Sequence, residues 1–258
     1  MFCMIRKMTS ASFVEIFTSI QGEGPWIGER HIFVRFFGCD LGCRYCDTSA
    51  SVRRGMDESS PKFCRVQMVS DPRSYERVPN PLSSTHLTDL CKRFIIPGPS
   101  RPTISLTGGE PLLHSTFLRV WLPSVRNTFK IYLETNGIHA EAMRDLWDLI
   151  DVVSMDFKLP SATRLRPYWE EHKRFLAEAA GKTLYAKAIV TNDTTIEDIT
   201  MAAGIIAASG QRFPLVLQPA SGPYAPESTM LLEFQSAALA RINDVRVIPQ
   251  AHKVLNVP

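Results

Sequence analysis

Short apolar segments with the character of β-strands alternate with amphipathic segments along most of the chain. The strand-like segments are rich in β-branched and aromatic residues and end at turn-forming or polar residues. They are Ile32–Phe37, Thr103–Leu106, Lys130–Glu134, Val152–Asp156, Leu184–Val190, Leu215–Leu217 and Val245–Ile248. Between them, apolar residues recur at helical spacing, which predicts helices with one buried face. These segments are Phe117–Asn127, Ala140–Leu149, Arg164–Ala180, Ile196–Ser209 and Glu227–Ile242.

This alternation predicts an α/β fold, with a parallel sheet joined by right-handed helical crossovers. Such sheets bind ligands at the carboxyl ends of their strands. Polar or glycine-containing segments follow the predicted strands at those ends: Cys39–Cys46, Gly108–Glu110, Glu134–Asn136, Ser154–Lys158 and Gln218–Ser221. One edge of the sheet would bring them together in a single site. Asn136 and Gly137 are explained equally well as tight-turn residues.

Residues 49–88 interrupt the alternation. The stretch Ser49–His86 is rich in Ser, Arg and Pro, which predicts an irregular insertion with a short strand at Phe63–Val69. The insertion either caps a site or forms a surface loop. Residues 1–258 are otherwise interpreted as a single domain, since the length suits one large domain.

Composition excludes several classes of partner. Hydrophobic residues make up 45% and charged residues 21% of the chain, which is ordinary for a globular protein. The net charge is +3 and basic residues form no long run, so nucleic-acid binding is not expected. The apolar stretches are shorter than the ~18 residues that span a membrane. Arg6 and Lys7 interrupt the apolar part of Met1–Phe13, which therefore lacks a signal-peptide core.

The most informative residues are Cys39, Cys43 and Cys46, spaced C-x3-C-x2-C. Fe–S clusters usually take four cysteine ligands, so three thiolates would leave one iron of a 4Fe–4S cluster open for a substrate or cofactor. Structural zinc prefers four ligands in two close pairs, whereas the remaining cysteines are isolated. A disulfide framework is not expected in a chain of this length. A thiolate cluster also needs a reducing compartment, which predicts a cytoplasmic protein.

The cysteine run, with Tyr45 before its last cysteine, resembles the signature of the radical S-adenosylmethionine (radical SAM) enzymes. Three further segments resemble the 7-carboxy-7-deazaguanine synthase family: Ser19–Pro25, Cys46–Thr48 and Gln250–Pro258. The resemblance extends from Phe13 to Pro258 and weakens across residues 49–88. It implies an incomplete, TIM-like βα barrel with the helices outside, and a homodimer.

The resemblance also implies a reaction. Members of the family convert 6-carboxy-5,6,7,8-tetrahydropterin to 7-carboxy-7-deazaguanine and ammonia, a step in queuosine biosynthesis. A 4Fe–4S cluster, reduced by an unidentified flavodoxin- or ferredoxin-like donor, gives an electron to SAM, and the resulting radical takes hydrogen from the pterin. The cofactor then carries the difficult chemistry while the protein binds, orients and shields.

Two other functions are compatible with the cysteine run. A radical SAM activase, which generates a glycyl radical on a partner protein, would share the cysteines and the Gly-Gly-Glu-Pro loop. It would lack the Gln21–Glu23 segment and the tail at His252–Pro258. A non-enzymatic iron–sulfur or zinc module would leave the polar strand ends unexplained.

The resemblance assigns most cofactor contacts. Cys39, Cys43 and Cys46 would bind iron, and the Gly108–Glu110 loop would meet the amino group of SAM. Glycines permit close backbone approach, and the Glu110 carboxylate would accept a hydrogen bond. The other positions that match SAM contacts are Tyr45, Asp47, Glu134, Ser154, Asp156, Lys158, Gln218 and Ser221. The family's Ser-Pro-Lys is replaced by Ser154–Lys158, so the choice among Ser154, Asp156 and Lys158 stays open, and a loop hydrogen bond explains Ser154 or Asp156 as well.

Substrate and magnesium contacts follow in the same way. Arg35 lies within an apolar strand and would bind the pterin carboxylate through two parallel hydrogen bonds, unless it faces the surface. The other implied substrate contacts are Ile20, Gln21, Gly22, Glu23, Thr107, His252 and the terminal carboxylate of Pro258. His252 suits a structural role as well. Mg²⁺ prefers oxygen ligands and would be bound by Thr48 with the substrate and water, although this hydroxyl also suits a backbone hydrogen bond.

Overall fold

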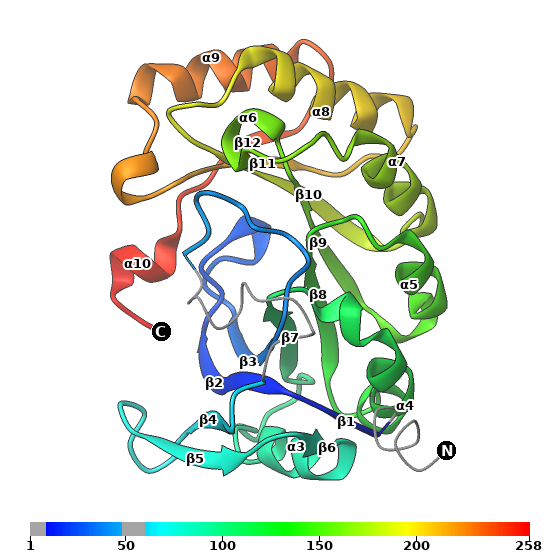
Figure 1. Ribbon diagram of the computed structural model, residues 1–258, viewed down its shortest axis with the longest axis vertical. Coiled ribbons are helices and arrows are strands. Elements are labelled where there is room, and N and C mark those ends of the chain that lie inside the picture. The colour runs from blue at the N-terminus through cyan, green and yellow to red at the C-terminus, as the bar shows by residue number, and fades with distance from the viewer. Residues whose placement is uncertain (1–8, 48–59) are drawn as a thin grey trace.

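One curved sheet forms the centre of the computed structural model, which describes residues 9–47 and 60–258 (Figure 1). Its strand order is β12-β11-β10-β9-β8-β7-β3-β2-β4-β5. The strands are β2 (Phe13–Ile20), β3 (Arg30–Phe36), β4 (Phe63–Gln67), β5 (Tyr75–Pro79), β7 (Thr103–Gly108), β8 (Lys130–Thr135), β9 (Val152–Phe157), β10 (Thr183–Val190), β11 (Leu215–Pro219) and β12 (Val245–Val247). A separate antiparallel pair joins β1 (Ser10–Ala11) to β6 (Leu82–Ser83).

Along the run β3-β7-β8-β9-β10-β11-β12, each strand is parallel to the next, and β2 is parallel to β4. Strands β2 and β3 are antiparallel, and so are β4 and β5. The expected α/β fold is therefore confirmed, with a sheet that is mainly rather than wholly parallel. β5 and β12 lie at its two edges, so the barrel is incomplete, as the resemblance implies.

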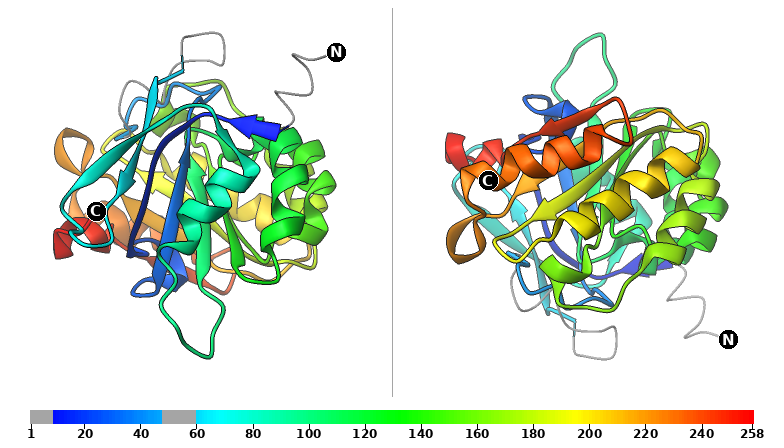
Figure 2. Two further views of the ribbon diagram at one scale, coloured as in Figure 1. Left: turned by 90° about the horizontal axis from the view of Figure 1, so that it is seen from below. Right: turned by 90° about the horizontal axis from the view of Figure 1, so that it is seen from above.

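The larger helices cover the outer face of the sheet, as both views in Figure 2 show. The helices are α3 (Ser84–Lys92), α4 (Ser115–Val125), α5 (Ala140–Asp145), α6 (Pro160–Thr163), α7 (Trp169–Glu178), α8 (Ile196–Ala208), α9 (Ser228–Leu239) and α10 (Ala251–Leu255). Short 3₁₀ turns occur at η1 (Gly24–Trp26), η2 (Pro111–His114), η3 (Trp147–Leu149) and η4 (Gly222–Tyr224). Fully buried side chains such as Phe117, Trp121 and Phe175 fill the layer between sheet and helices.

The predicted helix at Arg164–Ala180 is wrong in its first part. Helix α6 ends before Arg164, which adopts a left-handed backbone conformation (φ 60°), and α7 starts only at Trp169. Pro167 lies between them, and proline disfavours helical geometry in the residue before it. The other predicted helices form α4, α5 with η3, α8 and α9, with bounds that differ from the prediction by at most three residues.

The expectation of an irregular insertion is also wrong for residues 60–88. Strands β4 and β5 form a hairpin, and β4 pairs with β2, so the sheet extends into this segment. The short strand expected at Phe63–Val69 is confirmed as β4. Helix α3 follows, with the Ser83 hydroxyl accepting a hydrogen bond from the His86 backbone at its first turn.

Alternation along the parallel strands separates the apolar core from a polar interior. In β8, Ile131 and Leu133 pack towards the helices, whereas Tyr132 belongs to an inner cluster with Tyr185 and Trp26. Side chains in a strand point alternately to opposite faces, so Glu134 shares the inner face with Tyr132. The inner aromatic cluster lies towards the amino ends of the strands and leaves the carboxyl ends free for a site.

Candidate functional site

A pocket of about 510 Å³ lies at the carboxyl ends of the strands, within the usual size range of small-molecule sites. Each of five consecutive strands, β7 to β11, contributes one inner-face polar residue to its wall: Thr107, Glu134, Asp156, Lys187 and Gln218. The convergence predicted from the polar strand ends is therefore present. No helix in the described part of the chain is both long and apolar enough to cross a bilayer.

Most residues singled out in the sequence line this pocket. They are Ile20, Gln21, Gly22, Glu23, Arg35, Cys39, Cys43, Tyr45, Cys46, Asp47, Thr107, Gly108, Gly109, Glu134, Asp156, Lys158, Gln218, Ser221, His252 and Pro258. Glu110 and Ser154 are buried away from the lining. Thr48 lies outside the described residues. The pocket therefore brings together the residues expected for the cofactor and those expected for the substrate.

The three cysteines follow β3 and line the pocket. Burial raises the pKa of Cys39 to about 12 and also raises the pKa of Cys43. A bound metal offsets such a penalty because it holds its ligands as thiolates. Among residues 9–47 and 60–258, no three His, Cys, Asp or Glu side chains group tightly enough for a single metal ion. A 4Fe–4S cluster spreads its ligands over several irons, so it does not require three thiols grouped around one ion.

The glycine loop after β7 packs against the backbone that leads to the cysteines. Gly109 N donates to Phe36 O at 3.2 Å, and Glu110 N donates to Gly38 O at 2.8 Å. A Cβ on Gly109 would lie 1.8 Å from Gly38 O, and Gly108 has φ +124°. The close approach that these glycines permit is thus to the cysteine loop itself, and the loop places that segment beside the strand ends.

Glu110 holds two loops together. Its carboxylate accepts hydrogen bonds from Leu112 N (3.0 Å), Thr135 Oγ1 (2.8 Å) and Asn136 N (2.7 Å). Burial raises its pKa. All three partners are protein groups, so the Glu110 carboxylate fixes the glycine loop to the turn after β8. The expected contact of Glu110 with SAM stays a prediction.

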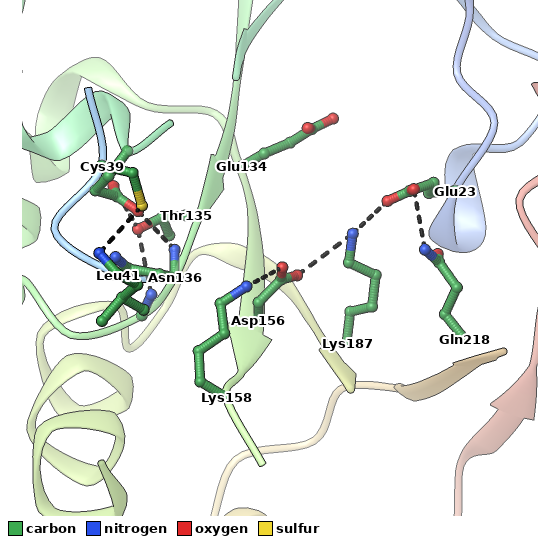
Figure 3. A network of polar contacts seen from close by, with 12 residues as sticks. Glu23, Cys39, Leu41, Glu134, Thr135, Asn136, Asp156, Lys158, Lys187 and Gln218 are labelled. Atoms are coloured by element: carbon green, nitrogen blue, oxygen red, sulfur yellow. Dashed lines mark hydrogen bonds and ion pairs between the residues drawn. The ribbon is translucent and has the colours of Figure 1, made fainter. Parts of the chain in front are cut away.

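Four charged side chains form a line of alternating sign across the pocket (Figure 3). Lys158 Nζ lies 2.8 Å from Asp156 Oδ2, Lys187 Nζ lies 3.4 Å from Asp156 Oδ1, and Lys187 also contacts Glu23. Burial would lower the pKa of both lysines, but the neighbouring carboxylates raise it well above its ordinary value. We call this set the buried charge chain.

Amide side chains complete the network on the side of the Ser19–Pro25 segment. Gln218 Nε2 and Gln250 Nε2 donate to Glu23 Oε1 at 2.9 and 2.8 Å. Gln21 Nε2 donates to Glu134 Oε1 at 3.0 Å, and Thr107 Oγ1 donates to Glu134 Oε2 at 2.6 Å. Burial raises the pKa of Glu134. The Gln21–Glu23 segment is therefore fixed to the strand ends by its side chains.

The C-terminal segment packs over the same residues. Ala251 N donates to Gly22 O at 2.8 Å, and Lys253 Nζ lies 2.8 Å from Asp47 Oδ2 and from Ser221 Oγ. A Cβ on Gly22 would lie 2.2 Å from His252 Nδ1, so this glycine is needed for the contact. Burial lowers the pKa of His252. The three segments that carry the family resemblance therefore meet at one place. Ser19 Oγ also donates to Pro258 O at 2.7 Å.

Arg35 faces the pocket and not the outer surface. Its Nε donates to Glu15 Oε1 at 2.9 Å, and Arg65 NH1 lies 3.8 Å from Glu15 Oε2. All three side chains line the pocket, and Arg65 comes from β4, the short strand expected within the insertion. We call Glu15, Arg35 and Arg65 the arginine rim.

Sequence reasoning missed several residues of the pocket: Glu15, Arg65, Lys187, Gln250 and Lys253. Lys187 did carry a signal, because it is a charged residue flanked by apolar residues within the strand Thr183–Val190. Gln250 and Lys253 belong to the quoted tail but had no assigned role. Glu15 and Arg65 are unremarkable in sequence, and only the pairing of β2 with β4 brings them together.

A sequence model of the radical SAM superfamily matches residues 33–201, so the chain belongs to this superfamily. Over 95% of its length the chain is 36% identical to the 7-carboxy-7-deazaguanine synthase of Geobacter sulfurreducens, of which 97% is covered. It is 34% identical to the protein of the same name from Thermococcus kodakarensis, with 94% and 97% of the two chains covered. The chain therefore belongs to the 7-carboxy-7-deazaguanine synthase family.

A solved structure has the same fold. The crystal structure of QueE from Escherichia coli matches with a TM-score of 0.60 at 23% identity, covering 94% of this chain and 95% of that chain. The match supports the incomplete barrel expected from the resemblance.

Proposed function

We propose that this protein converts 6-carboxy-5,6,7,8-tetrahydropterin to 7-carboxy-7-deazaguanine with loss of ammonia, a step towards queuosine. The observation that carries the proposal is the single pocket that holds the three cysteines together with the Gln21–Glu23 segment and the C-terminal segment. Membership of the 7-carboxy-7-deazaguanine synthase family supports the same reaction.

The cofactor half of the pocket is assigned to a 4Fe–4S cluster on Cys39, Cys43 and Cys46, and to SAM. When bound, the reduced cluster and SAM supply the radical that removes hydrogen from the substrate. The protein groups available to hold SAM are Tyr45, Asp47, Glu134, Asp156, Lys158, Gln218 and Ser221. Asp156 and Lys158 are already paired, and this pair can hold opposite charges on an amino acid without a large change in net charge.

The substrate half is assigned to the arginine rim and the Gln21–Glu23 segment. Two guanidinium groups share one carboxylate at the rim, which leaves one net positive charge for the substrate carboxylate. Gln21, Glu23, Thr107 and His252 offer hydrogen bonds to the pterin ring system. The C-terminal segment forms part of the pocket wall, and such enclosure helps to keep water from a reactive intermediate.

Further assignments rest on the family resemblance alone. They are Mg²⁺ held by Thr48 with the substrate, a homodimer, and reduction by a flavodoxin- or ferredoxin-like protein. A cytoplasmic location follows from the need to keep the cysteines reduced. Chelation of divalent ions tests the first, and should raise the KM for the substrate without removing iron from the cluster.

An activase function has less support. The Gln21–Glu23 segment and the C-terminal segment, which an activase should lack, are both present and hydrogen-bonded across the pocket.

The test is an anaerobic assay of the reconstituted protein with carboxytetrahydropterin, SAM, Mg²⁺ and a reductant. We expect 7-carboxy-7-deazaguanine and ammonia in equal amounts, and neither from a Cys43→Ser variant. If the wild-type protein binds iron and cleaves SAM but forms no deazaguanine, the proposed substrate is wrong. If it binds no iron, the radical SAM assignment fails as well.

A further inference from the structure

Lys187 is the residue of the pocket whose presence is hardest to explain by packing. It lies on the inner face of β10, where its side chain is 8% exposed. An apolar residue of similar volume would avoid the cost of burying a charge, and buried ion pairs are often no more stabilising than apolar replacements. The partners of its ammonium group therefore indicate what it does.

Those partners come from both halves of the pocket. Lys187 Nζ contacts the Glu23 carboxylate and lies 3.4 Å from Asp156 Oδ1. Asp156 is in turn paired with Lys158 at 2.8 Å. Removing Lys187 would thus leave Asp156 with a second cation, whereas Glu23 would lose the only cation of this chain that contacts it among the described residues (Figure 3).

The hydrogen bonds of Glu23 can be counted. An ionised carboxylate has about four acceptor positions. Gln218 and Gln250 donate to Oε1, and Lys187 donates to Oε2. Among the described residues, this leaves one acceptor position on Oε2 of a carboxylate that lines the pocket.

We propose that Lys187 is a positioning residue that holds Glu23 as an ionised, acceptor-only group, with one free acceptor position for an N–H of the pterin. The inference rests on the proposed function, since it names the substrate group that Glu23 reads. Ionised Glu23 selects a ring edge that donates hydrogen bonds, as the amino and amide N–H groups of a pterin do. Protonated Glu23 would present a donor and disfavour that edge.

The charges around Glu23 agree with this assignment. Burial alone would raise the pKa of Glu23, but the Lys187 ammonium and the hydrogen bonds from Lys187, Gln250 and Gln218 lower it to about 2. The other titratable groups that face it are Glu134 on β8, Asp47 after the cysteines, and His252 and Lys253 on α10. Loss of Lys187 therefore lets burial and the two carboxylates push the Glu23 pKa upward.

The affinity for the pterin should depend on pH differently with and without Lys187. With Lys187 present, Glu23 stays ionised throughout pH 6 to 8. Without it, Glu23 takes up a proton as the pH falls, and affinity for the pterin falls with it. Lys187 also lowers the pKa of His252, so a Glu23→Gln background is the control that shows whether His252 contributes to the difference.

The experiment measures the Kd of 6-carboxypterin, an oxidised and unreactive analogue of the substrate, for the holoenzyme at pH 6 and pH 8. For Lys187→Met, we expect the ratio of the Kd at pH 6 to the Kd at pH 8 to exceed the wild-type ratio by about tenfold, the change produced when Glu23 goes from about one-tenth protonated at pH 8 to about nine-tenths protonated at pH 6. Lys187→Arg keeps the cation and should restore the wild-type ratio. In a Glu23→Gln background, Lys187→Met should add no pH dependence.

Several outcomes would overturn the inference. One is a folded Lys187→Met protein with the wild-type ratio of Kd values. Another is extra pH dependence that persists in the double variant, because Lys187 would then act through a different group. If Lys187→Met does not fold, the double variant Glu23→Gln/Lys187→Met decides, because it removes one charge of each sign. Its Kd for 6-carboxypterin should lie within about twofold of the Kd of Glu23→Gln. A Kd about tenfold higher than that of Glu23→Gln contradicts the proposal.

Failure of the proposed function would look different. If wild-type holoenzyme neither binds 6-carboxypterin nor converts carboxytetrahydropterin, the substrate assignment is wrong irrespective of Lys187. If wild type does both while the variants behave as in the preceding paragraph, only the role of Lys187 is rejected.

Discussion

The buried charge chain and the arginine rim lie in the same pocket but are built differently. In the buried charge chain, the side chains of Lys187 and Lys158 are 8% and 12% exposed. With Asp156 and Glu23 they come from three segments of the fold: the loop after β2, the end of β9, and β10. At the rim, Arg35 is 24% and Arg65 58% exposed, and both use Glu15. The chain is therefore shielded from solvent, whereas the rim is partly open to it.

This difference separates two ways of binding a polar ligand. Charges in the buried charge chain are paired with one another before any ligand arrives. They therefore fix the orientation of a ligand and keep their own positions when it binds, as preorganised groups do. Charges in the arginine rim are screened by solvent and can exchange one ion-pair partner for another at little cost. This suits groups that bind the substrate carboxylate as it enters. The comparison predicts that mutations in the buried charge chain act mainly on the stability of the protein and the geometry of the pocket. Mutations in the arginine rim should act mainly on substrate affinity.

The largest effect is a loss of unfolding free energy, expected from Asp156→Asn in the buried charge chain. Lys158 would keep its burial but lose its carboxylate, and breaking one side of a buried ion pair costs about 3 kcal/mol or more. Urea unfolding under anaerobic conditions measures this loss. The matched rim variant, Glu15→Gln, should cost about 1 kcal/mol or less. Equal losses in the two variants would remove the distinction between the regions.

The next effect is expected from Arg35→Ala at the rim. Loss of a charged hydrogen bond to the substrate carboxylate should raise the KM about 30-fold, or about 2 kcal/mol, while unfolding changes little. Steady-state kinetics with carboxytetrahydropterin, together with urea unfolding, checks both parts. An unchanged KM would show that Arg35 only balances Glu15. Arg35→Lys keeps the charge and should recover part of the loss.

A third prediction concerns acid. The pKa of Glu23 is lowered from 4.5 to about 2 in the folded protein, so its contribution to stability is fully present above pH 4.5 and is lost as the pH falls towards 2. The difference in free energy of unfolding between wild type and Glu23→Gln should therefore become smaller as the pH falls from 4.5 towards 2. Measuring both proteins at each pH cancels the acid response of the other groups. A gap that is constant from pH 7 to pH 3 would contradict the ion pair.

The smallest effect is expected from Arg65→Ala. Arg65 is more exposed than Arg35 and lies farther from Glu15, so its loss should raise the KM only about threefold. High salt should reduce the difference between this variant and wild type, because exposed charges are screened. An effect as large as that of Arg35→Ala would place Arg65 in direct contact with the carboxylate.

The sequence predicted the parallel strands and most helices because their burial patterns are regular. It missed β2, β5 and α3. Strand β2 is half-buried and antiparallel, and the hairpin β4–β5 is stabilised by pairing across the sheet more than by its own composition. The Arg164–Ala180 helix was too long because periodicity alone does not register the break before Trp169.

Within the site, residues with a distinctive type and spacing could be predicted, whereas those defined by a distant partner could not. Cys39, Cys43 and Cys46 are recognised from their spacing, and Gln21 and Glu23 from the motif around them. For Glu110, the local motif predicts a contact with SAM but does not reveal the hydrogen bonds that its carboxylate accepts from Thr135 and Asn136. Lys187 is explained only once Glu23 and Asp156 are brought together by the curved sheet.

The most direct test of the whole account is an isotope transfer. The anaerobic, reduced protein is incubated with SAM and with carboxytetrahydropterin deuterated in its saturated ring, and 5′-deoxyadenosine is examined by mass spectrometry. The account predicts 5′-deoxyadenosine that carries deuterium, formed together with 7-carboxy-7-deazaguanine. Formation of 5′-deoxyadenosine without deuterium, at the same rate whether or not the pterin is present, would contradict it.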